Sequence, residues 1–437
     1  MIKLSIKQAW NLMKQNKLFT GIYVAGTGLA IAMTMTVFIV LYVKFAPIYP
    51  EYNRDRTLVL KSVTRTNKDK TQGDWSSNIA YSLKEMLVEL PHLDKIGTTV
   101  RTDFGSTTVV VPQSQTSLKV SSILTDKEYW EVFTFQFLGG RAFTEAEVKS
   151  DMSMVILSES MAKTLTGSVD AVGKLVFING KEHQVCGVVK DASTITPVTS
   201  ADVYLPLSYN SRAFQANGLL GSVHFYMTST DASDNDLLKT EVQDVINRYN
   251  QGDTKYEWNI WGQPDEYWKS TFRINTGQEL DMKELIKGFL YILLALLFIP
   301  ALNLSGMISS RMNRRVAEFG VRKSYGATNA QIIGQVLSEN LFLTFMGGIL
   351  GILFSYVIVL MANEWIMYIF NEVQSVNPFE APPIFTFEML FNLTLFMIVL
   401  GLCIVLNLIS ALVPTVWALR KPIVECLYSK LKKEELI

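Results

Sequence analysis

Side chains able to do acid–base, metal or phosphate chemistry are few and scattered in this chain of 437 residues. Its three histidines, His92, His183 and His224, lie far apart in the sequence and lack the spacing of metal ligands. We interpret them as surface or partly buried side chains. The sequence therefore predicts neither a catalytic centre nor a metal site, and we do not expect an enzyme.

One glycine-rich segment comes close to a nucleotide-binding loop: Gly167-Ser-Val-Asp-Ala-Val-Gly173-Lys174-Leu175. A phosphate-binding loop needs four residues between its glycines, and Ser or Thr after the lysine to hold magnesium. Five residues separate the glycines here, and Leu175 cannot bind the ion. We reject a nucleotide site and expect no cofactor in this chain.

The segment 311–339 has charges at helical spacing. Arg314, Glu318 and Arg322 follow one another at i, i+4 and i+8, which places alternating charges on one helix face. Gly326 is suited to end that helix, and the capping-box pattern 328–331 predicts that a second helix starts there. Two interpretations stay open: an interfacial helix that only anchors the topology, or a docking element for a cytoplasmic partner.

Four long uncharged stretches must position this segment: 18–43, 288–310, 340–363 and 389–419. Each reaches the roughly 20 residues with which a helix crosses the hydrocarbon of a bilayer. The sequence predicts an α-helical membrane protein with four transmembrane helices. A large domain lies between the first and second helices.

Orientation follows from the charges. Basic residues dominate 1–17 and 311–339 and are in excess in 420–437, whereas 364–388 carries four glutamates and no Lys or Arg. The positive-inside rule places both termini in the cytoplasm and the segments 44–287 and 364–388 outside. The net charge of zero hides this asymmetry.

The outer segment has the pattern of an α+β domain. Runs rich in β-branched residues predict strands at 107–111, 120–124, 154–157, 184–189, 203–207 and 223–228. Apolar periodicity predicts helices at 77–89, 157–166 and 237–249, the second capped by Ser158. The aromatic run 129–137 is expected in the core, and one outer cysteine, Cys186, leaves no internal disulfide.

Polar and small residues within the apolar stretches suggest helix packing. Asn303 and Asn407 are expected to hydrogen-bond between helices, although a transport pathway would also use polar groups there. Gly347 and Gly351 form a small-xxx-small pair that allows close helix approach. No Asp, Glu, Lys, Arg or His lies in any of the four stretches, so an ion-coupled relay is poorly supported.

The charged segment resembles that of a known family. Its residues are Arg315-Val-Ala-Glu318-Phe-Gly320-Val321-Arg322-Lys323-Ser-Tyr-Gly326-Ala-Thr, followed by Gln331-Ile332 and Glu339. This resembles the loop of MacB/FtsX-type ABC transporter permeases, whose pattern is Glu-Ile-Gly-Val-Arg-Lys-Ala-Leu-Gly-Ala. Phe319, Ser324 and Tyr325 depart from it. Segments such as 135–140 and 185–191 resemble the MacB-like periplasmic core domain of the same family.

The resemblance implies a mechanism. Such permeases work as dimers, each bound to a cytoplasmic ABC ATPase that holds ATP and Mg, and they transmit its motion to the periplasmic domain. The ATPase-coupling loop would comprise Arg315, Glu318, Gly320, Val321, Arg322, Lys323 and Gly326. Fused relatives carry the ATPase at the N-terminus, for which residues 1–17 leave no room. The expected location is the bacterial inner membrane.

The resulting division of the chain alternates membrane and soluble segments. We expect a cytoplasmic segment at 1–17, spans at 18–45, 283–310, 340–363 and 389–419, the coupling loop at 311–339, a short periplasmic loop at 364–388 and a tail at 420–437. The periplasmic core domain at 46–282 would comprise a porter-like part, 46–123 with 208–282, and an inserted lobe at 124–207.

Three functions fit these expectations. The first is export or extraction of lipoproteins, peptides or amphiphilic compounds, and the large outer domain favours it. The second is signalling, through a periplasmic cell-wall hydrolase or as a sensor of antimicrobial peptides. The third is an anchored binding module without energy input, against which the coupling-like loop argues. The expected partners are the ATPase, a second permease (identical or a sister chain), the bilayer and periplasmic or outer-membrane proteins. No nucleic acid is expected.

Overall fold

The computed structural model describes residues 17–69, 73–101, 107–111, 116–150, 152–193, 196–273, 277–361 and 393–420. The chain forms two compact units. One, here called the helical unit, comprises Met1–Leu41, Met282–Ile366 and Thr386–Ile437. The other, here called the α+β domain, comprises Tyr42–Asp281 and Met367–Phe385. The predicted loop 364–388 lies outside the described residues.

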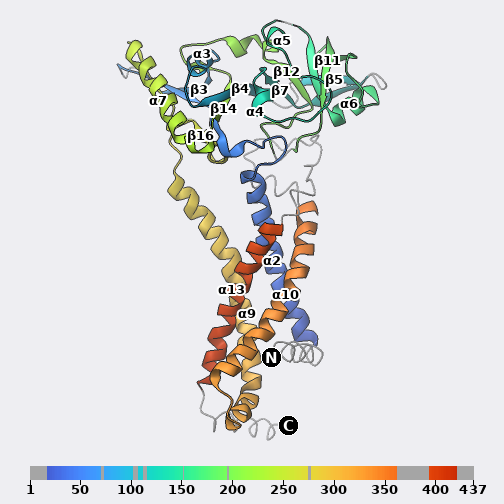
Figure 1. Cartoon of the computed structure of the whole chain (residues 1–437), viewed down its shortest axis with the longest axis vertical. Coiled ribbons are helices and arrows are strands. Elements are labelled where there is room, and N and C mark those ends of the chain that lie inside the picture. The colour runs from blue at the N-terminus through green and yellow to red at the C-terminus, as the bar shows by residue number, and fades with distance from the viewer. Residues whose placement is uncertain are drawn as a thin grey trace. The chain divides into compact units, whose positions relative to one another are not determined.

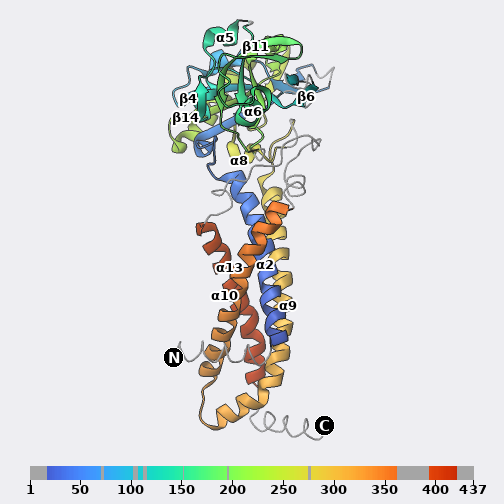
Figure 2. The same cartoon turned by 90° about the vertical axis from the view of Figure 1, so that its right-hand side faces the viewer.

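The helical unit is a bundle of long helices: α2 Lys17–Phe45, α9 Met282–Ser324, α10 Asn329–Met361 and α13 Leu393–Leu419 (Figure 2). Helix α13 packs against both α9 and α10. Among the described residues, three segments are long and apolar enough to cross a membrane: Thr20–Ile39, Asn329–Met361 and Phe396–Leu419. The fourth expected span, 288–310, is helical as part of α9, and the count of four remains a prediction.

The charged segment is not a separate short helix. Helix α9 continues without a break for 43 residues and includes the residues 311–324 at its C-terminal end. This end of the helix contains no proline. Its one glycine, Gly320, lies within the helix and does not end it, whereas Gly326 follows the helix end. The second apolar stretch and the charged segment therefore belong to one continuous helix.

The α+β domain (Figure 1) is built on a large sheet. This sheet has 12 strands in the order β16-β1-β14-β4-β7-β12-β9-β11-β10-β5-β6, with β8 beside β11. The strands are β1 Thr57–Leu60, β4 Leu93–Arg101, β5 Thr107–Val111, β6 Thr116–Val120, β7 Ser122–Thr125, β8 Phe137–Gly140, β9 Met154–Ser158, β10 Leu175–Ile178, β11 Lys181–Val189, β12 Val203–Pro206, β14 His224–Ser229 and β16 Asp265–Glu266. The pairs β7–β12 and β9–β11 are parallel, and the other pairs are antiparallel.

A second sheet of four strands has the order β13-β3-β2-β15. Its strands are β2 Val63–Asn67, β3 Trp75–Ile79, β13 Leu220–Gly221 and β15 Tyr256–Asn259. Helices of the domain are α3 Leu83–Leu87, α4 Tyr129–Val132, α5 Glu145–Lys149, α6 Glu159–Thr166, α7 Asn235–Gly252 and α8 Tyr267–Ser270. Short 3-10 turns are Arg54–Arg56, Leu207–Tyr209, Ser211–Phe214 and Ala232–Asp234.

Most of the predicted elements of the domain are confirmed. All six predicted strands overlap observed ones, and Ser158 caps α6 by accepting a hydrogen bond from the Met161 N–H at 3.2 Å. The helix predicted at 77–89 is wrong in its first half. There, 77–79 belongs to β3, which pairs with β2 and β13, and only Leu83–Leu87 is helical. Sheet pairing with distant segments overrides the local periodicity.

The aromatic run lies in the core, as predicted. Tyr129, Trp130, Phe133 and Phe135 are all buried. The Trp130 ring lies 4.9 Å from that of Phe135 and 5.3 Å from that of Tyr204 on β12. Tilted and edge-on ring contacts of this kind add to the energy of burial alone. They join α4 to the part of the large sheet where β7 and β12 meet.

Candidate functional site

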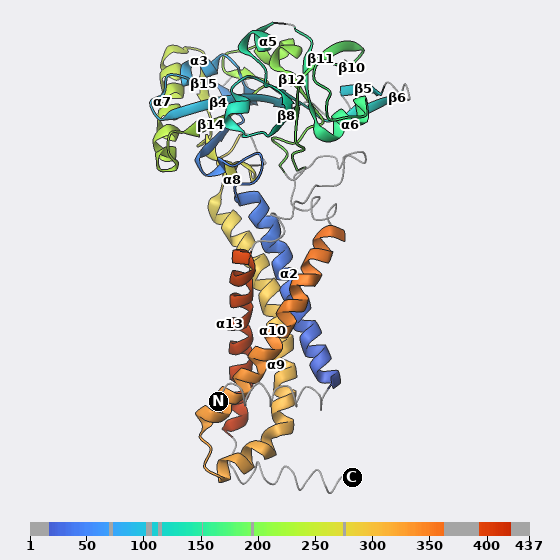
Figure 3. The ribbon, with the colours of Figure 1, turned by 45° about the vertical axis from the view of Figure 1, so that its right-hand side comes forward.

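The turn between α9 and α10 is closed by two helix-capping motifs (Figure 3). The Ala327 N–H donates to the Arg322 carbonyl and the Gly326 N–H to the Lys323 carbonyl, both at 3.0 Å. This is the Schellman pattern, and Gly326 takes the positive φ of +91° that it requires. Gly326 thus ends the helix as predicted, because other residues adopt such a φ only under strain.

A capping box starts the next helix. The Gln331 N–H donates to the Thr328 hydroxyl at 3.3 Å, and the Thr328 N–H donates to the Gln331 side chain at 3.0 Å. Each of the two residues thus provides a side-chain acceptor for the backbone N–H of the other, and these N–H groups at the start of α10 would otherwise lack a partner within the helix. The predicted capping box is confirmed, and only residues 325–328 separate α9 from α10. The turn is therefore short and well defined.

Arg315 joins α9 to α10 by ion pairs. Its guanidinium donates to Glu318 at 2.9 Å within α9, and to Glu339 on α10 at 2.7 Å. The exposed fraction of the side chain is 10% for Arg315 and 2% for Glu339. A fork-shaped guanidinium can hold two carboxylates at once, and burial excludes competing water. The two helices are thereby fixed to each other roughly two and a half turns from the capped loop.

A second arginine extends this network. Arg322 donates to Glu318 at 2.6 Å and also to the Gln335 side-chain oxygen on α10. The Gln335 amide in turn donates to Glu339 at 3.0 Å. We call Arg315, Glu318, Arg322, Gln335 and Glu339 the brace. Its two positive and two negative side chains balance one another, which suits their partial burial.

The brace lowers the pKa of Glu318. Burial alone would raise this pKa, but hydrogen bonds and positive charge from Arg315 and Arg322 outweigh it and hold the pKa below its usual range. The carboxylate is therefore ionised at neutral pH. It acts as a structural counter-ion, not as a proton carrier.

Helix α13 also contacts this end of α9. The Lys323 ammonium donates to the Leu419 carbonyl at the C-terminal end of α13, at 2.7 Å. A cation is favourable there because helix C-termini carry unpaired carbonyls and a negative partial charge. Beneath the brace, Val316, Phe319, Ile332 and Val336 are buried in one apolar cluster. The C-terminal end of α9 is thus held by α10 and α13 together.

The predicted coupling residues divide into two groups. Arg315, Glu318, Arg322 and Lys323 contact residues of the same chain, and Gly320 is buried. Val321 instead faces outward, with an exposed fraction of 44%. Tyr325, which the sequence prediction did not include, is also exposed, at 88%. The sequence prediction omitted Gln335 from the site. Its i, i+4 spacing to Glu339 on α10 was the available signal.

The predicted packing glycines lie where α2 meets α10. A Cβ on Gly347 would come 2.9 Å from the Thr27 Cβ, and one on Gly351 would come 2.8 Å from the Gly28 carbonyl oxygen. At both positions there is room only for the hydrogen atom of a glycine. Glycines at such positions allow the backbones of two helices to approach closely. Asn407 on α13 donates to the Thr344 hydroxyl on α10 at 3.0 Å. The side chain of Asn303 lies outside the described residues.

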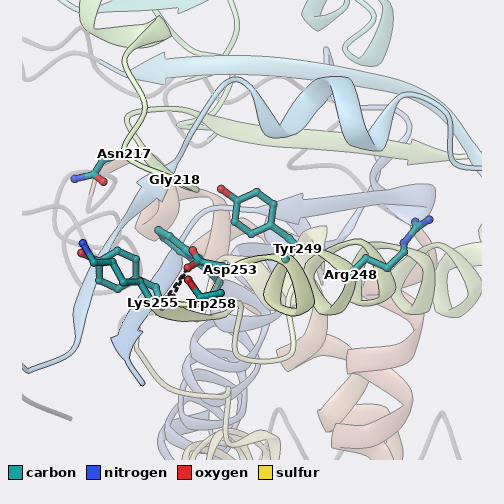
Figure 4. A pocket seen from close by; sticks show the side chains of 10 residues that line it. Asn217, Gly218, Arg248, Tyr249, Asp253, Lys255 and Trp258 are labelled. Carbon is teal, nitrogen blue, oxygen red and sulfur yellow. Dashed lines mark hydrogen bonds between the residues drawn. The ribbon is translucent and has the colours of Figure 1, made fainter. Parts of the chain in front are cut away.

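The α+β domain contains a hollow of about 590 Å³ at the end of α7 (Figure 4). Asp253 at its floor accepts hydrogen bonds from the Trp258 indole at 2.8 Å and from two backbone N–H groups. A Cβ on Gly218 would meet the Trp258 ring at 2.3 Å, so a glycine is needed beside it. Arg248 and Lys255 have no carboxylate partner within the described part of the chain. The rim carries the positive charges of Arg248 and Lys255, and its one carboxylate, Asp253, is already engaged in hydrogen bonds within the domain.

The near-miss glycine loop is an ordinary turn. Gly167 ends α6 with φ +73°, and Gly173 has φ +83°. The Gly173 N–H and the Val185 N–H are paired with backbone carbonyls across the turn to β11. Among the described residues, no group of three or more His, Cys, Asp or Glu could hold a metal ion.

Apolar spanning helices, a braced turn between two of them and a large α+β domain inserted after the first are features of a membrane permease. Two families match the chain: the MacB-like periplasmic core domain over residues 20–245, and the FtsX-like permease C-terminal domain over residues 290–423. The chain belongs to the MacB/FtsX-type ABC transporter permeases. It is an inner-membrane protein with a large extracytoplasmic domain.

Known relatives cover only part of the chain. The uncharacterized ABC transporter permease YknZ of Bacillus subtilis is 24% identical over 52% of this chain and 54% of its own length. The macrolide export ATP-binding/permease protein MacB of Aggregatibacter actinomycetemcomitans is 28% identical over 59% of this chain and 38% of its own length. This chain thus spans about a third to a half of the length of such relatives.

Solved structures of the extracytoplasmic part are also similar. The periplasmic region of MacB from Actinobacillus actinomycetemcomitans is 18% identical and covers 50% of this chain and 94% of its own, with a TM-score of 0.34. The extracellular domain of YknZ is 16% identical and covers 45% and 98%, with a TM-score of 0.33.

Proposed function

We propose that this chain is a permease subunit that couples ATP hydrolysis by a separate cytoplasmic ATPase to motion of its extracytoplasmic domain. The observation that carries the proposal is the brace. Ion pairs and a capped turn fix the end of α9 to α10, and Lys323 fixes it to α13. A push on this turn would therefore displace three helices together, instead of bending a flexible loop.

The proposed topology places this turn in the cytoplasm, with both termini on the same side. Basic residues in 1–17, 311–339 and 420–437 support this orientation. Four spans follow if 288–310 crosses the bilayer as part of α9. ATP and magnesium would then bind on the partner, since the glycine loop of this chain is a turn of the α+β domain.

Export or extraction of a lipoprotein, peptide or amphiphilic compound is the function that we favour. Relatives named for macrolide export and for pyoverdine export support it. The large α+β domain also supports it, because a domain of this size can enclose or guide a cargo. We infer that the cargo is handled outside the bilayer and that a second permease chain completes the unit.

Co-purification from solubilised membranes tests the proposal. The wild-type chain should retain an ABC ATPase, identified by mass spectrometry. Glu318→Arg combined with Arg322→Glu should lose it. The first change places a second positive charge beside Arg315, and the second places a negative charge on the side of Gln335 and Glu339, so the brace is disrupted. The matched control is Glu284→Arg with Lys287→Glu, which inverts an exposed ion pair at the other end of α9 and should keep the ATPase. A wild-type chain that retains no ATPase even after crosslinking would contradict the proposal.

A second measurement addresses the cargo. ATP-dependent release of a lipoprotein or an amphiphilic peptide from spheroplasts, lost in the double variant, would support export. Activation of a cell-wall hydrolase without any release would point to signalling instead.

A further inference from the structure

We propose that Tyr325, supported by Val321, is the side chain that inserts into the ATPase and determines which ATPase this permease accepts. The inference rests on the proposed function, because it assumes an ATPase at the α9–α10 turn. It differs from the expectation drawn from the sequence, whose coupling loop included Val321 but not Tyr325.

The charged residues are already occupied within the chain. Arg315 and Glu339 are almost fully buried against each other, and Glu318 is shared by two arginines. Glu318 and Arg322 keep exposed fractions of 40% and 36%, but each charge is already compensated within the brace. Separating one member of such a pair from the other leaves a partly buried charge uncompensated. We therefore assign the charged residues to holding the turn and look for the main contact with a partner in other side chains.

Tyr325 is the most exposed large side chain of the turn. Its exposed fraction is 88%, and that of Val321, one helical turn earlier, is 44%. Residues four positions apart lie on the same face of a helix end, so the two side chains form one apolar projection. Tyrosine is enriched at the centre of interfaces because its ring buries a large area with little loss of conformational entropy.

The backbone beneath Tyr325 is fixed before any partner arrives. The Tyr325 N–H donates to the Val321 carbonyl at 3.2 Å, and Gly326 follows in the Schellman turn. Thr328 and Gln331 close the other side of the turn. A side chain carried on an ordered turn binds with a smaller entropy cost than one on a mobile loop. The geometry suits insertion into a preformed cleft.

A protein suits this projection better than a lipid surface. The uncharged run of α10 starts only at residue 340, so residues 329–339 extend about 16 Å of helix beyond it. Tyr325 lies four residues before this segment begins. On the proposed topology, in which the span starts at residue 340, that distance exceeds the depth of the headgroup layer, in which interfacial tyrosines anchor. The partner should offer a cleft with apolar walls and a polar group for the phenol.

Tyr325 also stands where this chain departs from the loop pattern that it otherwise resembles, in which a leucine precedes the glycine. The two other departures, at residues 319 and 324, do not project in this way: Phe319 is buried, and the Ser324 hydroxyl donates to the Val321 carbonyl. An exposed difference at the tip of an otherwise typical turn is suited to discriminate among related ATPases.

The test uses the full chain in nanodiscs and the ATPase identified by co-purification with the wild type. Tyr325→Asp should weaken binding of the purified ATPase about tenfold or more, as expected for an aromatic anchor. Tyr325→Phe should keep most of it. Asn329→Asp is the matched control, because it adds the same charge at an exposed position of the same turn, where a helix N-terminus tolerates it. Melting curves should show that all three variants fold.

A photo-crosslinking amino acid at position 325 gives an independent readout. A covalent adduct with the ATPase, absent for the same amino acid at position 329, supports the inference. Crosslinks to lipid alone would overturn it, as would a Tyr325→Asp chain that binds the ATPase as tightly as the wild type does. In the latter case the proposed function would stand. A wild-type chain without any ATPase would overturn both.

Discussion

At the scale of single residues, burial decides what the few titratable side chains can do. His92 pairs with Glu241 at 2.6 Å, and His183 is buried. Burial, assisted by the charge of Lys61, lowers the pKa of His224 from its ordinary value to about 4. Burial raises the pKa of the Cys186 thiol to about 12, which leaves it unreactive.

The pKa of His224 predicts acid sensitivity of the fold. In the unfolded chain the imidazole takes up a proton near pH 6.5, whereas in the folded domain it stays neutral down to about pH 4. Stability is therefore complete above pH 6.5 and falls as the pH drops from 6.5 towards 4, by on the order of 1 kcal/mol between pH 6.5 and 5. Melting temperatures of the wild type and of His224→Gln, compared from pH 5 to 6.5, check this.

The variant should show a flatter slope in that range. Equal slopes for both chains would mean that another group is responsible. The range above pH 5 is chosen because most carboxylates have lost their protons there.

At the scale of elements, close approach and buried polar contacts hold the helices together. Helix α2 meets α10 at Gly28, Gly347 and Gly351, and α10 meets α13 through Thr344 and Asn407. In a bilayer, packing of this kind replaces the hydrophobic effect as the force between helices. Together with the brace, these contacts join α10 to α2, α9 and α13.

Gly351→Ala should separate α2 from α10. The new Cβ would lie 2.8 Å from both the Gly28 carbonyl oxygen and the Ile31 Cβ, and neither the backbone nor a branched side chain can yield easily. We expect a loss of about 1–3 kcal/mol, typical of overpacking, seen as a lower melting temperature of the full chain in detergent.

The control for this prediction is Gly401→Ala on α13. Nothing lies within 4 Å of the position its Cβ would take. This change should be neutral, or stabilising by about 0.5–1 kcal/mol, because alanine favours the helix more than glycine does. If both variants melted alike, the contact between α2 and α10 would carry no such energy.

At the scale of the whole molecule, a buried carboxylate joins segments far apart in the sequence. Glu51 is 1% exposed and accepts hydrogen bonds from Arg54 at 2.8 Å, from the Thr199 hydroxyl at 2.8 Å and from the Tyr267 hydroxyl at 2.5 Å. Arg54 also donates to the Ala46 carbonyl at 2.8 Å. The first and last segments of the α+β domain, which lead from α2 and towards α9, are thus held at one point.

Glu51→Gln should therefore destabilise the α+β domain strongly. It would leave the Arg54 guanidinium, whose side chain is 5% exposed, without its counter-ion, which costs about 3–5 kcal/mol in comparable buried pairs. Denaturant unfolding followed by tryptophan fluorescence measures the loss.

Asp94→Asn is the comparison variant. It removes a more exposed ion pair with Arg56, with exposed fractions of 36% and 30%, and should cost under about 1 kcal/mol. A loss for Glu51→Gln no larger than this would show that the buried junction contributes little to stability.

The sequence by itself determined the features that depend on local pattern. Apolar length predicted the helices of the membrane part, and turn chemistry predicted both caps around Gly326 and the start of α6 at Ser158. Capping and periodicity act within a few residues, so they can be read along the chain.

Only the tertiary structure decided which side chains meet. It paired Arg315 with Glu339 and Arg322 with Gln335, brought Thr199 and Tyr267 to Glu51, and drew 77–79 into β3. It also divided the coupling motif into braced charges and an exposed Tyr325. These outcomes depend on packing between distant segments, where the energy of burial and of paired charges exceeds local preference.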